Sequence, residues 1–377
     1  MRSGFLAQEE RLHEDAIAAT GLSDFGDICY REGLRQLLNA RDESGVDYPQ
    51  AGAPILGMIG QLLTTRLVTL ERIRPHRAAL PQISRPIFVI GLPRTGTTAM
   101  QRLLMADPQM QGLEYWLGAS PKQRPPRHNW PQDEEFRACM DQLAQMELFA
   151  PLVTRMHPMA ADKGEECRLI MEQSFGHSSF SLVAPIRRYQ DWLFSSDLTP
   201  HYTHFKEALQ LIGMNDSART WVLKCPHHAP QMDSLLRVFP DARIIFMHRP
   251  VEELIPSVTQ LAAAFLGMVE GAGVDMIRRA AMIVDNLDLT LRRLLATRAA
   301  HPDSFFDLTM ERFVADPLDA VEAAYARFGI PLRDESRTAL SDWISHNHGG
   351  HGSPATTTLP FNLDAGALRE RFSYYLG

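Results

Sequence analysis

One junction between a short apolar run and a glycine-containing turn constrains the fold of this chain more than any other segment. Residues 87–90, Ile-Phe-Val-Ile, form a continuous apolar run that stops at Gly91. Such a run is typical of a strand that is buried on both faces of a parallel sheet. Residues 97–106 then place apolar side chains at helical spacing. We therefore predict that the chain passes from a buried strand to a helix through the turn 91–98.

Further runs of the same kind predict the fold class. The other predicted strands are 221–223, 243–247 and 305–308, and a helical stripe at 232–239 separates the first two. Strands that alternate with helices predict an α/β fold, in which helices flank a parallel sheet.

The rest of the chain divides into segments of distinct composition. We predict an N-terminal helical segment, 1–82, with a turn at 45–54, followed by a main domain, 83–377. Within the main domain we predict a surface loop at 119–131, a helical insertion at 133–218 and a flexible loop or lid at 345–360.

Composition narrows the possible functions. The chain has 38 Lys and Arg against 45 Asp and Glu, so its net charge of −7 argues against a general nucleic-acid-binding protein. It contains no uninterrupted apolar run of membrane-spanning length and no apolar leader, so we expect no membrane span. Its four cysteines are widely separated, so neither a disulfide framework nor a zinc site is indicated. We therefore expect a cytoplasmic protein.

The N-terminal helices could support a homodimer.

The turn after the first strand has the composition of a phosphate-binding loop. Its sequence is Gly-Leu-Pro-Arg-Thr-Gly-Thr-Thr, and its two glycines have the spacing of a P-loop. A nucleotide triphosphatase has lysine where this chain has Thr97, and that lysine neutralises the β- and γ-phosphates of Mg·ATP. The loop instead carries one cation, Arg94. The residues expected to bind phosphate without a metal are Arg94, Thr95, Gly96, Thr97 and Thr98.

A second motif lies at the end of the strand predicted at 243–247. Arg249 follows this strand, and Ser257 lies eight residues further on. Because Pro256 fits the first turn of a helix, we expect a new helix to begin there. An arginine and a serine hydroxyl that meet at such a point suit a phosphate monoester.

Two motifs in this order, 155 residues apart from Arg94 to Arg249, make the chain similar to the PAPS-dependent sulfotransferases. The resemblance is to the bacterial type related to the tyrosylprotein and heparan-modifying enzymes. It implies that the first motif binds the 5′-phosphosulfate of PAPS (3′-phosphoadenosine 5′-phosphosulfate). It also implies that Arg249 and Ser257 bind the 3′-phosphate. The expected activity is transfer of a sulfuryl group to a hydroxyl or amine, with release of PAP and without a metal.

The sequence indicates the catalytic residues less clearly than the phosphate-binding residues. Arg94 and Lys224 are the predicted cations at the transferred group, since Lys224 ends a predicted strand. The resemblance assigns the catalytic base to Glu114, and His227 is a displaced alternative. His157 and the pair Glu165-Glu166 are weaker candidates. We interpret that pair as an acidic helix start, where adjacent side chains do not face each other and do not form a dyad.

Two other functions remain open at this point. One is a P-loop kinase-like phosphotransferase, although no strand ending in a magnesium-binding aspartate is evident. The other is a non-catalytic nucleotide-binding protein. Aromatic and methionine side chains in 133–218 indicate a small-molecule or lipid-like acceptor that is partly apolar.

Overall fold

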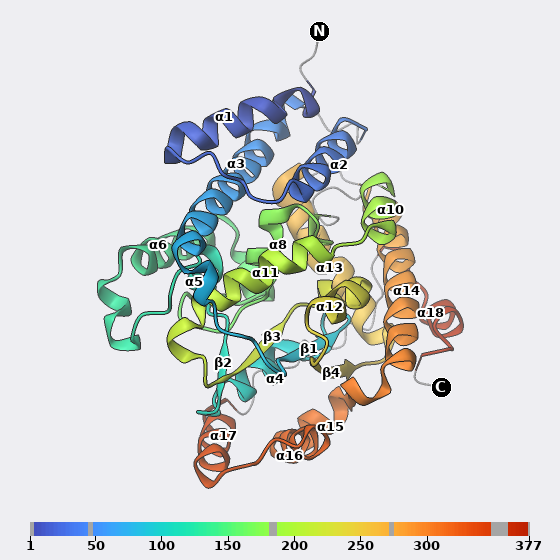
Figure 1. Ribbon diagram of the computed structural model, residues 1–377. Helices are drawn as coiled ribbons and strands as arrows, with labels where there is room; N and C mark the ends of the chain where they lie inside the picture. Colours follow the sequence, from blue (N-terminus) through green and yellow to red (C-terminus); the bar gives the residue numbers. More distant parts are fainter. Residues whose placement is uncertain (1–3, 44–47, 181–186, 271–274, 348–360, 376–377) are drawn as a thin grey trace.

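A five-stranded parallel sheet lies at the centre of the molecule (Figure 1). The computed structural model describes residues 4–43, 48–180, 187–270, 275–347 and 361–375. The strand order is β2-β3-β1-β4-β5. The strands are β1 (Ile87–Gly91), β2 (Met110–Gly112), β3 (Thr220–Lys224), β4 (Arg243–His248) and β5 (Phe305–Thr309). The predicted α/β class is confirmed, as are four of these strands. The sequence did not reveal β2, because it has three residues and a glutamine at its centre.

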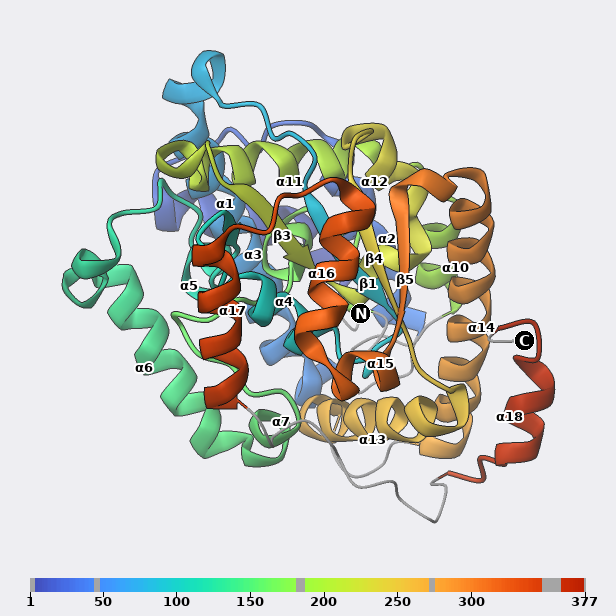
Figure 2. The ribbon, with the colours of Figure 1, turned by 90° about the horizontal axis from the view of Figure 1, so that it is seen from below.

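Alternate side chains of each strand enter different cores. Phe88 and Leu223 belong to one hydrophobic cluster, whereas Ile87 and Val222 belong to the other. This alternation follows from the two-residue period of a strand. The helices that contribute to the first cluster include α11 (Thr199–Ile212), α12 (Met232–Val238) and α14 (Met276–Ala300). Those that contribute to the second include α4 (Thr97–Leu104), α16 (Pro317–Phe328) and α17 (Asp334–Asn347), which cover the opposite face of the sheet (Figure 2).

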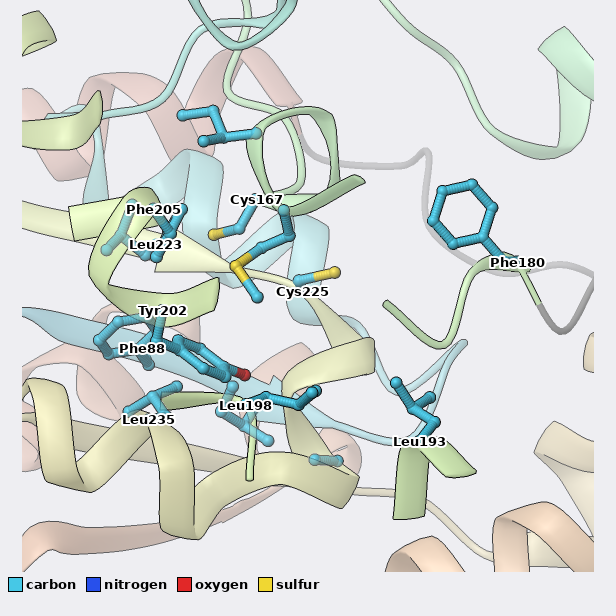
Figure 3. Packing of buried hydrophobic residues seen from close by; sticks show 14 of the residues in the cluster. Phe88, Cys167, Phe180, Leu193, Leu198, Tyr202, Phe205, Leu223, Cys225 and Leu235 are labelled. Atoms are coloured by element: carbon cyan, nitrogen blue, oxygen red, sulfur yellow. The ribbon is translucent and has the colours of Figure 1, made fainter. Parts of the chain in front are cut away.

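The first cluster is rich in aromatic side chains. Phe88 of β1 lies among Tyr202 and Phe205 of α11 and Leu235 of α12 (Figure 3). Its ring also meets His228 edge-on, with ring centroids 5.5 Å apart. Tight packing of this kind holds β1 in place, and β1 in turn positions the glycine turn that follows it.

The N-terminal helices pack onto this core. They are α1 (Glu9–Thr20), α2 (Cys29–Glu43) and α3 (Tyr48–Ile73), and α3 contacts α1, α11 and α13 (Val251–Glu270). The predicted turn at 45–54 is wrong for its residues 48–54, which are helical although Pro54 removes one hydrogen bond. The apolar side chains that follow Pro54 compensate for this loss, since Ile59 and Leu63 are fully buried.

One stretch, Gly52–Ala79, is long and apolar enough to cross a membrane by length and composition alone. It also carries Arg66, whose buried guanidinium donates to Ser174 Oγ at 2.9 Å. α3 contacts three other helices and holds this buried polar group against the insertion, so one face of the helix packs onto the rest of the protein.

The predicted insertion at 133–218 is largely helical in its described residues. With its flanks it contains α5 (Tyr115–Ala119), α6 (Glu134–Phe149), α7 (Pro151–Met156), α8 (Arg168–Met171), α10 (Arg187–Ser195) and α11. The remaining α-helices are α15 (Met310–Ala315) and α18 (Ala365–Arg371). The short 3₁₀ turns are η1 (Leu6–Gln8), η2 (Arg74–Ala79), η3 (Arg127–Gln132), η4 (Glu172–Ser174), η5 (Met214–Asp216), η6 (Pro226–Gln231) and η7 (Pro302–Ser304).

The structure differs from the prediction in one loop, and most of a second predicted loop lies outside the described residues. The segment 119–131 is not purely a surface loop, because Arg124 and Trp130 are buried within it. The guanidinium of Arg124 forms an ion pair with Glu114, and the indole of Trp130 packs edge-on against Trp116. Of the predicted lid at 345–360, residues 345–347 are the end of α17, and 348–360 lie outside the described residues.

Buried histidines make the stability of this core sensitive to acid. Burial lowers the pKa of His201 to about 4 and that of His228 to about 3, and it lowers the pKa of His204 well below 6.5. In the unfolded chain these groups bind protons near pH 6.5. Between pH 6.5 and 4 the unfolded state therefore holds more protons, so the free energy of unfolding falls as the pH falls. Each histidine contributes about 1.4 kcal/mol per pH unit at most.

Urea unfolding at pH 7, 6 and 5 measures this slope. We expect His204→Gln to flatten it, since the amide can keep the hydrogen bond to Gln173 without taking up a proton. The control His301→Gln replaces an exposed ring and should leave the slope unchanged. A wild-type unfolding free energy that is flat from pH 7 to 5 would contradict the prediction.

Candidate active site

The turn between β1 and α4 adopts the backbone conformation that a phosphate-binding loop requires. Arg94 and Gly96 have φ angles of 72° and 85°, in the left-handed region. A β-carbon on Gly91 would lie 2.5 Å from Thr95 Oγ1 and 2.7 Å from the carbonyl oxygen of Met247, so only glycine fits there. The buried Thr95 hydroxyl closes the turn by donating to the carbonyl of Leu92 at 2.8 Å.

The start of α4 is suited to an anion. Gly96 is its N-cap residue and supplies no side-chain hydrogen bond to the first-turn amides. Those N–H groups have no acceptor within the helix, and the helix dipole adds partial positive charge there. Thr97 and Thr98 begin the helix at this point, which gives a ready site for a phosphate or sulfate group.

The two sequence motifs meet in the structure. Arg94 Nε donates to Ser257 Oγ at 3.1 Å, and Arg249 Nη1 donates to the carbonyl oxygen of Arg94, also at 3.1 Å. Burial, and then the neighbouring positive charge of Arg249, lower the pKa of Arg94. Two guanidinium groups in such proximity favour an anion between or beside them.

The helix that carries Ser257 begins earlier than expected. It is α13, which starts at Val251 and contains Pro256 in its interior, so the predicted start at Pro256 is wrong. The carbonyl of Pro250 accepts the first hydrogen bonds of the helix, from the amides of Glu253 and Leu254. The proline at the helix start is therefore Pro250, and Ser257 lies almost two turns into α13.

A buried ion pair lies at the end of β3. Lys224 Nζ donates to Glu166 Oε1 at 2.9 Å, and the lysine side chain is 1% exposed. Burial opposes ionisation of Glu166, but the Lys224 ammonium outweighs it and holds the pKa of this carboxyl below its usual range. Burial likewise opposes the charge on Lys224, while Glu166 raises its pKa. The second carboxylate oxygen, Oε2, accepts a weak hydrogen bond from the Cys225 thiol at 3.8 Å.

A second carboxylate adjoins the first. Glu165 Oε1 lies 3.2 Å from His157 Nε2 and accepts from the backbone amide of Glu166 at 2.9 Å. Ligand-type atoms of His157, Glu165 and Glu166 all lie within 4.8 Å of one another, a donor set that could hold a divalent cation. The ammonium of Lys224 already places a positive charge beside Glu166, one of these three residues.

Backbone contacts connect these carboxylates to the phosphate-binding turn. Arg94 Nη1 donates to the carbonyl of Met156 at 3.0 Å, directly before His157 in the chain. Gln101 of α4 donates to the carbonyl of Glu165 at 3.1 Å. The segment with Glu165 and Glu166 is thus anchored to the helix that begins at the phosphate-binding turn.

The predicted helix at Glu165-Glu166 is wrong. These residues form an extended loop, and α8 begins only at Arg168. The amide of Glu165 donates to the carbonyl of Leu113, and the amide of Cys167 donates to that of Lys224. Gly164 directly precedes the pair. Because glycine is a poor helix former, it indicates in the sequence that the helix begins after Glu166.

Glu114, the base implied by resemblance, lies on the other side of this loop. Its backbone pairs with Gly164, but its carboxylate faces Arg124, whose Nε and Nη2 donate to Oε2 at 3.2 and 3.0 Å. Arg124 also binds Gln111 and Asp216. The Glu114 carboxylate is thus one part of a buried charge network that joins β2 to the insertion.

His227 lies close to the Lys224–Glu166 pair. Its Nδ1 hydrogen-bonds with Ser178 Oγ at 2.6 Å, and its ring meets that of His177 with centroids 4.9 Å apart. Burial lowers the pKa of His227 to about 4. The ring is therefore neutral at pH 7.

Comparisons with known proteins agree with this geometry. A sequence model of the sulfotransferase family matches residues 86–334. The crystal structure of sulfotransferase STF1 from Mycobacterium tuberculosis H37Rv aligns with a TM-score of 0.86 and 35% identity, covering 98% of this chain and 99% of that one. Sulfotransferase STF9 from Mycobacterium avium aligns with a TM-score of 0.86 and 27% identity, covering 97% and 95%.

A curated relative is the omega-hydroxy-beta-dihydromenaquinone-9 sulfotransferase Stf3 of Mycobacterium bovis and Mycobacterium tuberculosis. It is 25% identical over 274 residues, which cover 65% of this chain and 63% of the relative. The match therefore spans less than two thirds of that relative's length. The family match over 86–334 contains the phosphate-binding turn, the Lys224–Glu166 pair and the Arg249–Ser257 motif. The chain belongs to the sulfotransferase family.

Proposed function

We propose that this member of the sulfotransferase family takes a sulfuryl group from PAPS and transfers it to a hydroxyl or amine on a partly apolar acceptor. The observation that carries the proposal is the contact of Arg94 with Ser257 and Arg249. It brings two anion sites together at one edge of the sheet, and PAPS has two anionic ends. The family generally uses this donor, and membership of it argues against the kinase-like and non-catalytic alternatives.

Each end of PAPS has a matching set of groups. The 5′-phosphosulfate would bind at the first turn of α4, to the backbone amides there, to the hydroxyls of Thr97 and Thr98, and to Arg94. The 3′-phosphate would bind to Arg249 and Ser257. No step of this scheme requires a metal, because guanidinium groups and helix amides supply the positive charge.

We further propose Glu166 as the catalytic base, in place of Glu114. In the transfer, an acceptor oxygen forms a bond to sulfur, the bond from sulfur to the bridging oxygen breaks, and the acceptor proton passes to the base. Glu166 is ionised, and among the described residues the hydrogen bond that its Oε2 accepts is a weak one from a thiol. Glu114 instead accepts two hydrogen bonds from Arg124. Lys224 and Arg94 would stabilise charge on the departing oxygen.

The acceptor class is proposed from composition and from one relative. The name of the Stf3 relative states a hydroxylated menaquinone as its substrate. The insertion of this chain carries apolar and methionine side chains, which suit a lipid-like small molecule. We also propose a cytoplasmic location, which fits the four free cysteines of the chain.

The Arg249→Ala variant tests the 3′-phosphate site. A charge-assisted hydrogen bond contributes about 1.5–3 kcal/mol, so we expect PAP affinity to fall about 10- to 100-fold. Adenosine 5′-phosphosulfate, which lacks the 3′-phosphate, should bind with little change. Isothermal titration calorimetry of both ligands measures the difference. An equal loss for the two ligands would assign Arg249 a structural role.

The Glu166→Gln variant tests the catalytic base. The amide can still accept a hydrogen bond from Lys224 but is not basic, so we expect the single-turnover transfer rate from PAPS to fall about 10²- to 10⁴-fold. PAP affinity should stay close to that of the wild type, which shows that the variant is folded.

Glu114→Gln is the matched control. It should keep most of the rate but lose about 1–3 kcal/mol of stability, because a buried hydrogen bond to Arg124 is weakened. Near-normal turnover in Glu166→Gln together with collapse in Glu114→Gln would return the base to Glu114. Collapse in His227→Ala alone would assign the base to the histidine.

A further inference from the structure

An apolar groove of about 800 Å³ lies between α6, α7 and the loop that follows α7. Its wall includes Phe136, Met140 and Leu143 from α6, and Met159 from the loop. This volume is in the range of ligand-binding clefts, and the lining is of the apolar kind that such clefts use. None of the groups assigned above to PAPS lines it.

Four exposed apolar side chains lie on α6 and α7, and one of them, Met140, lines the groove. Met140, Leu148, Phe149 and Leu152 are 52%, 80%, 85% and 53% exposed. They account for four of the nine large hydrophobic side chains that are exposed among the described residues, and they lie within thirteen positions of one another. Clustered apolar exposure of this kind marks a surface that receives an apolar partner.

The groove and the proposed active site share one segment of chain. Thr154, Pro158 and Met159 line the groove, while Met156 and His157, between them, contact Arg94 and Glu165. The carbonyl of Pro158 also accepts from Arg102 of α4 at 3.2 Å. On its other side α7 packs against α13, the helix that carries Ser257. The segment 154–159 is therefore a wall that the groove shares with the proposed reaction site.

We propose that this groove binds the aliphatic chain of the acceptor and directs its hydroxyl group toward Glu166. The inference rests on the proposed function and adds the place and the chemistry of the acceptor site. A concave, apolar groove that shares a wall with the proposed reaction site suits a flexible chain that carries one polar end. The charged groups that line it, which include Arg137, Glu147 and Asp162, are of both signs and so select no charged ligand.

Binding of cis-parinaric acid, a fluorescent fatty-acid probe, and its displacement by 1-decanol test the groove without any transfer step. We expect the wild type to bind the probe and Met140→Glu to bind it at least tenfold more weakly, since a carboxylate would have to be desolvated against the chain. Met140 is 52% exposed, so the variant should fold normally, as its melting temperature will show.

Leu289→Glu is the control variant. It places the same charge at a 44% exposed apolar position on α14, and α14 does not line the groove. It should bind the probe as the wild type does. Equal probe affinity in the wild type and Met140→Glu, or no binding by the wild type, would overturn the inference. Unchanged probe affinity together with loss of a dimer in Met140→Glu would assign the surface to a second copy of the chain, and would also overturn it.

Transfer from PAPS to primary alcohols, from 1-butanol to 1-decanol, supplies the second measurement. Burial of each further methylene should raise kcat/KM about fourfold until the groove is filled. Met140→Glu should flatten this dependence on chain length, and Leu289→Glu should preserve it. Probe binding without transfer to any alcohol would refute the proposed function while leaving the groove assignment intact. Transfer with the same length dependence in Met140→Glu as in the wild type would overturn the groove assignment alone.

Discussion

The ion pair between Lys224 and Glu166 is the interaction on which the proposed site depends. Its lysine side chain is 1% exposed, and an isolated charge at such a depth costs several kcal/mol. The pair can persist only if both partners are held in register. β3 fixes Lys224, and the extended loop that carries Glu166 bonds to Lys224 on one side and to Leu113 on the other. A small shift of either segment would leave a buried charge without a partner.

The same sheet edge collects the rest of the site. Because all five strands are parallel, their carboxyl ends meet there. β1 ends at the phosphate-binding turn, β3 at Lys224, and β4 just before Arg249. Backbone contacts from Arg94 and Gln101 then hold the carboxylate loop against the phosphate-binding helix. The proposed nucleotide site and the proposed acceptor site are thereby connected through the segment 156–166.

Much of this arrangement could be predicted from the sequence, because it follows from local patterns. Continuous apolar runs predicted four strands, and the rule that parallel strands end at one edge predicted that Arg94, Arg249 and Lys224 lie on the same side of the sheet. The contact of Arg94 with Ser257 was not predicted, because the two residues are 163 positions apart and no local pattern joins them.

The carboxylates were harder to predict for a physical reason. The partner of Glu166 is 58 positions away, and nothing near Glu166 in the chain indicates that a lysine will meet it. Interpreted as a helix start, the pair Glu165-Glu166 was only a weak candidate for the base, although Gly164 argued for a loop. Glu114 is a neighbour of that loop through its backbone, and only the position of Arg124 shows that its carboxylate is engaged elsewhere. Arg124 in turn comes from a proline-rich stretch that was expected at the surface.

A crystal structure of the protein with PAP tests the central claim most directly. Our account predicts the 5′-phosphate at the first turn of α4, within reach of Thr97 and Thr98, and the 3′-phosphate in contact with Arg249 and Ser257. The Lys224–Glu166 pair should then border the space beyond the 5′-phosphate. A 3′-phosphate bound away from Arg249 and Ser257, or a 5′-phosphate away from the turn at 91–98, would contradict the account.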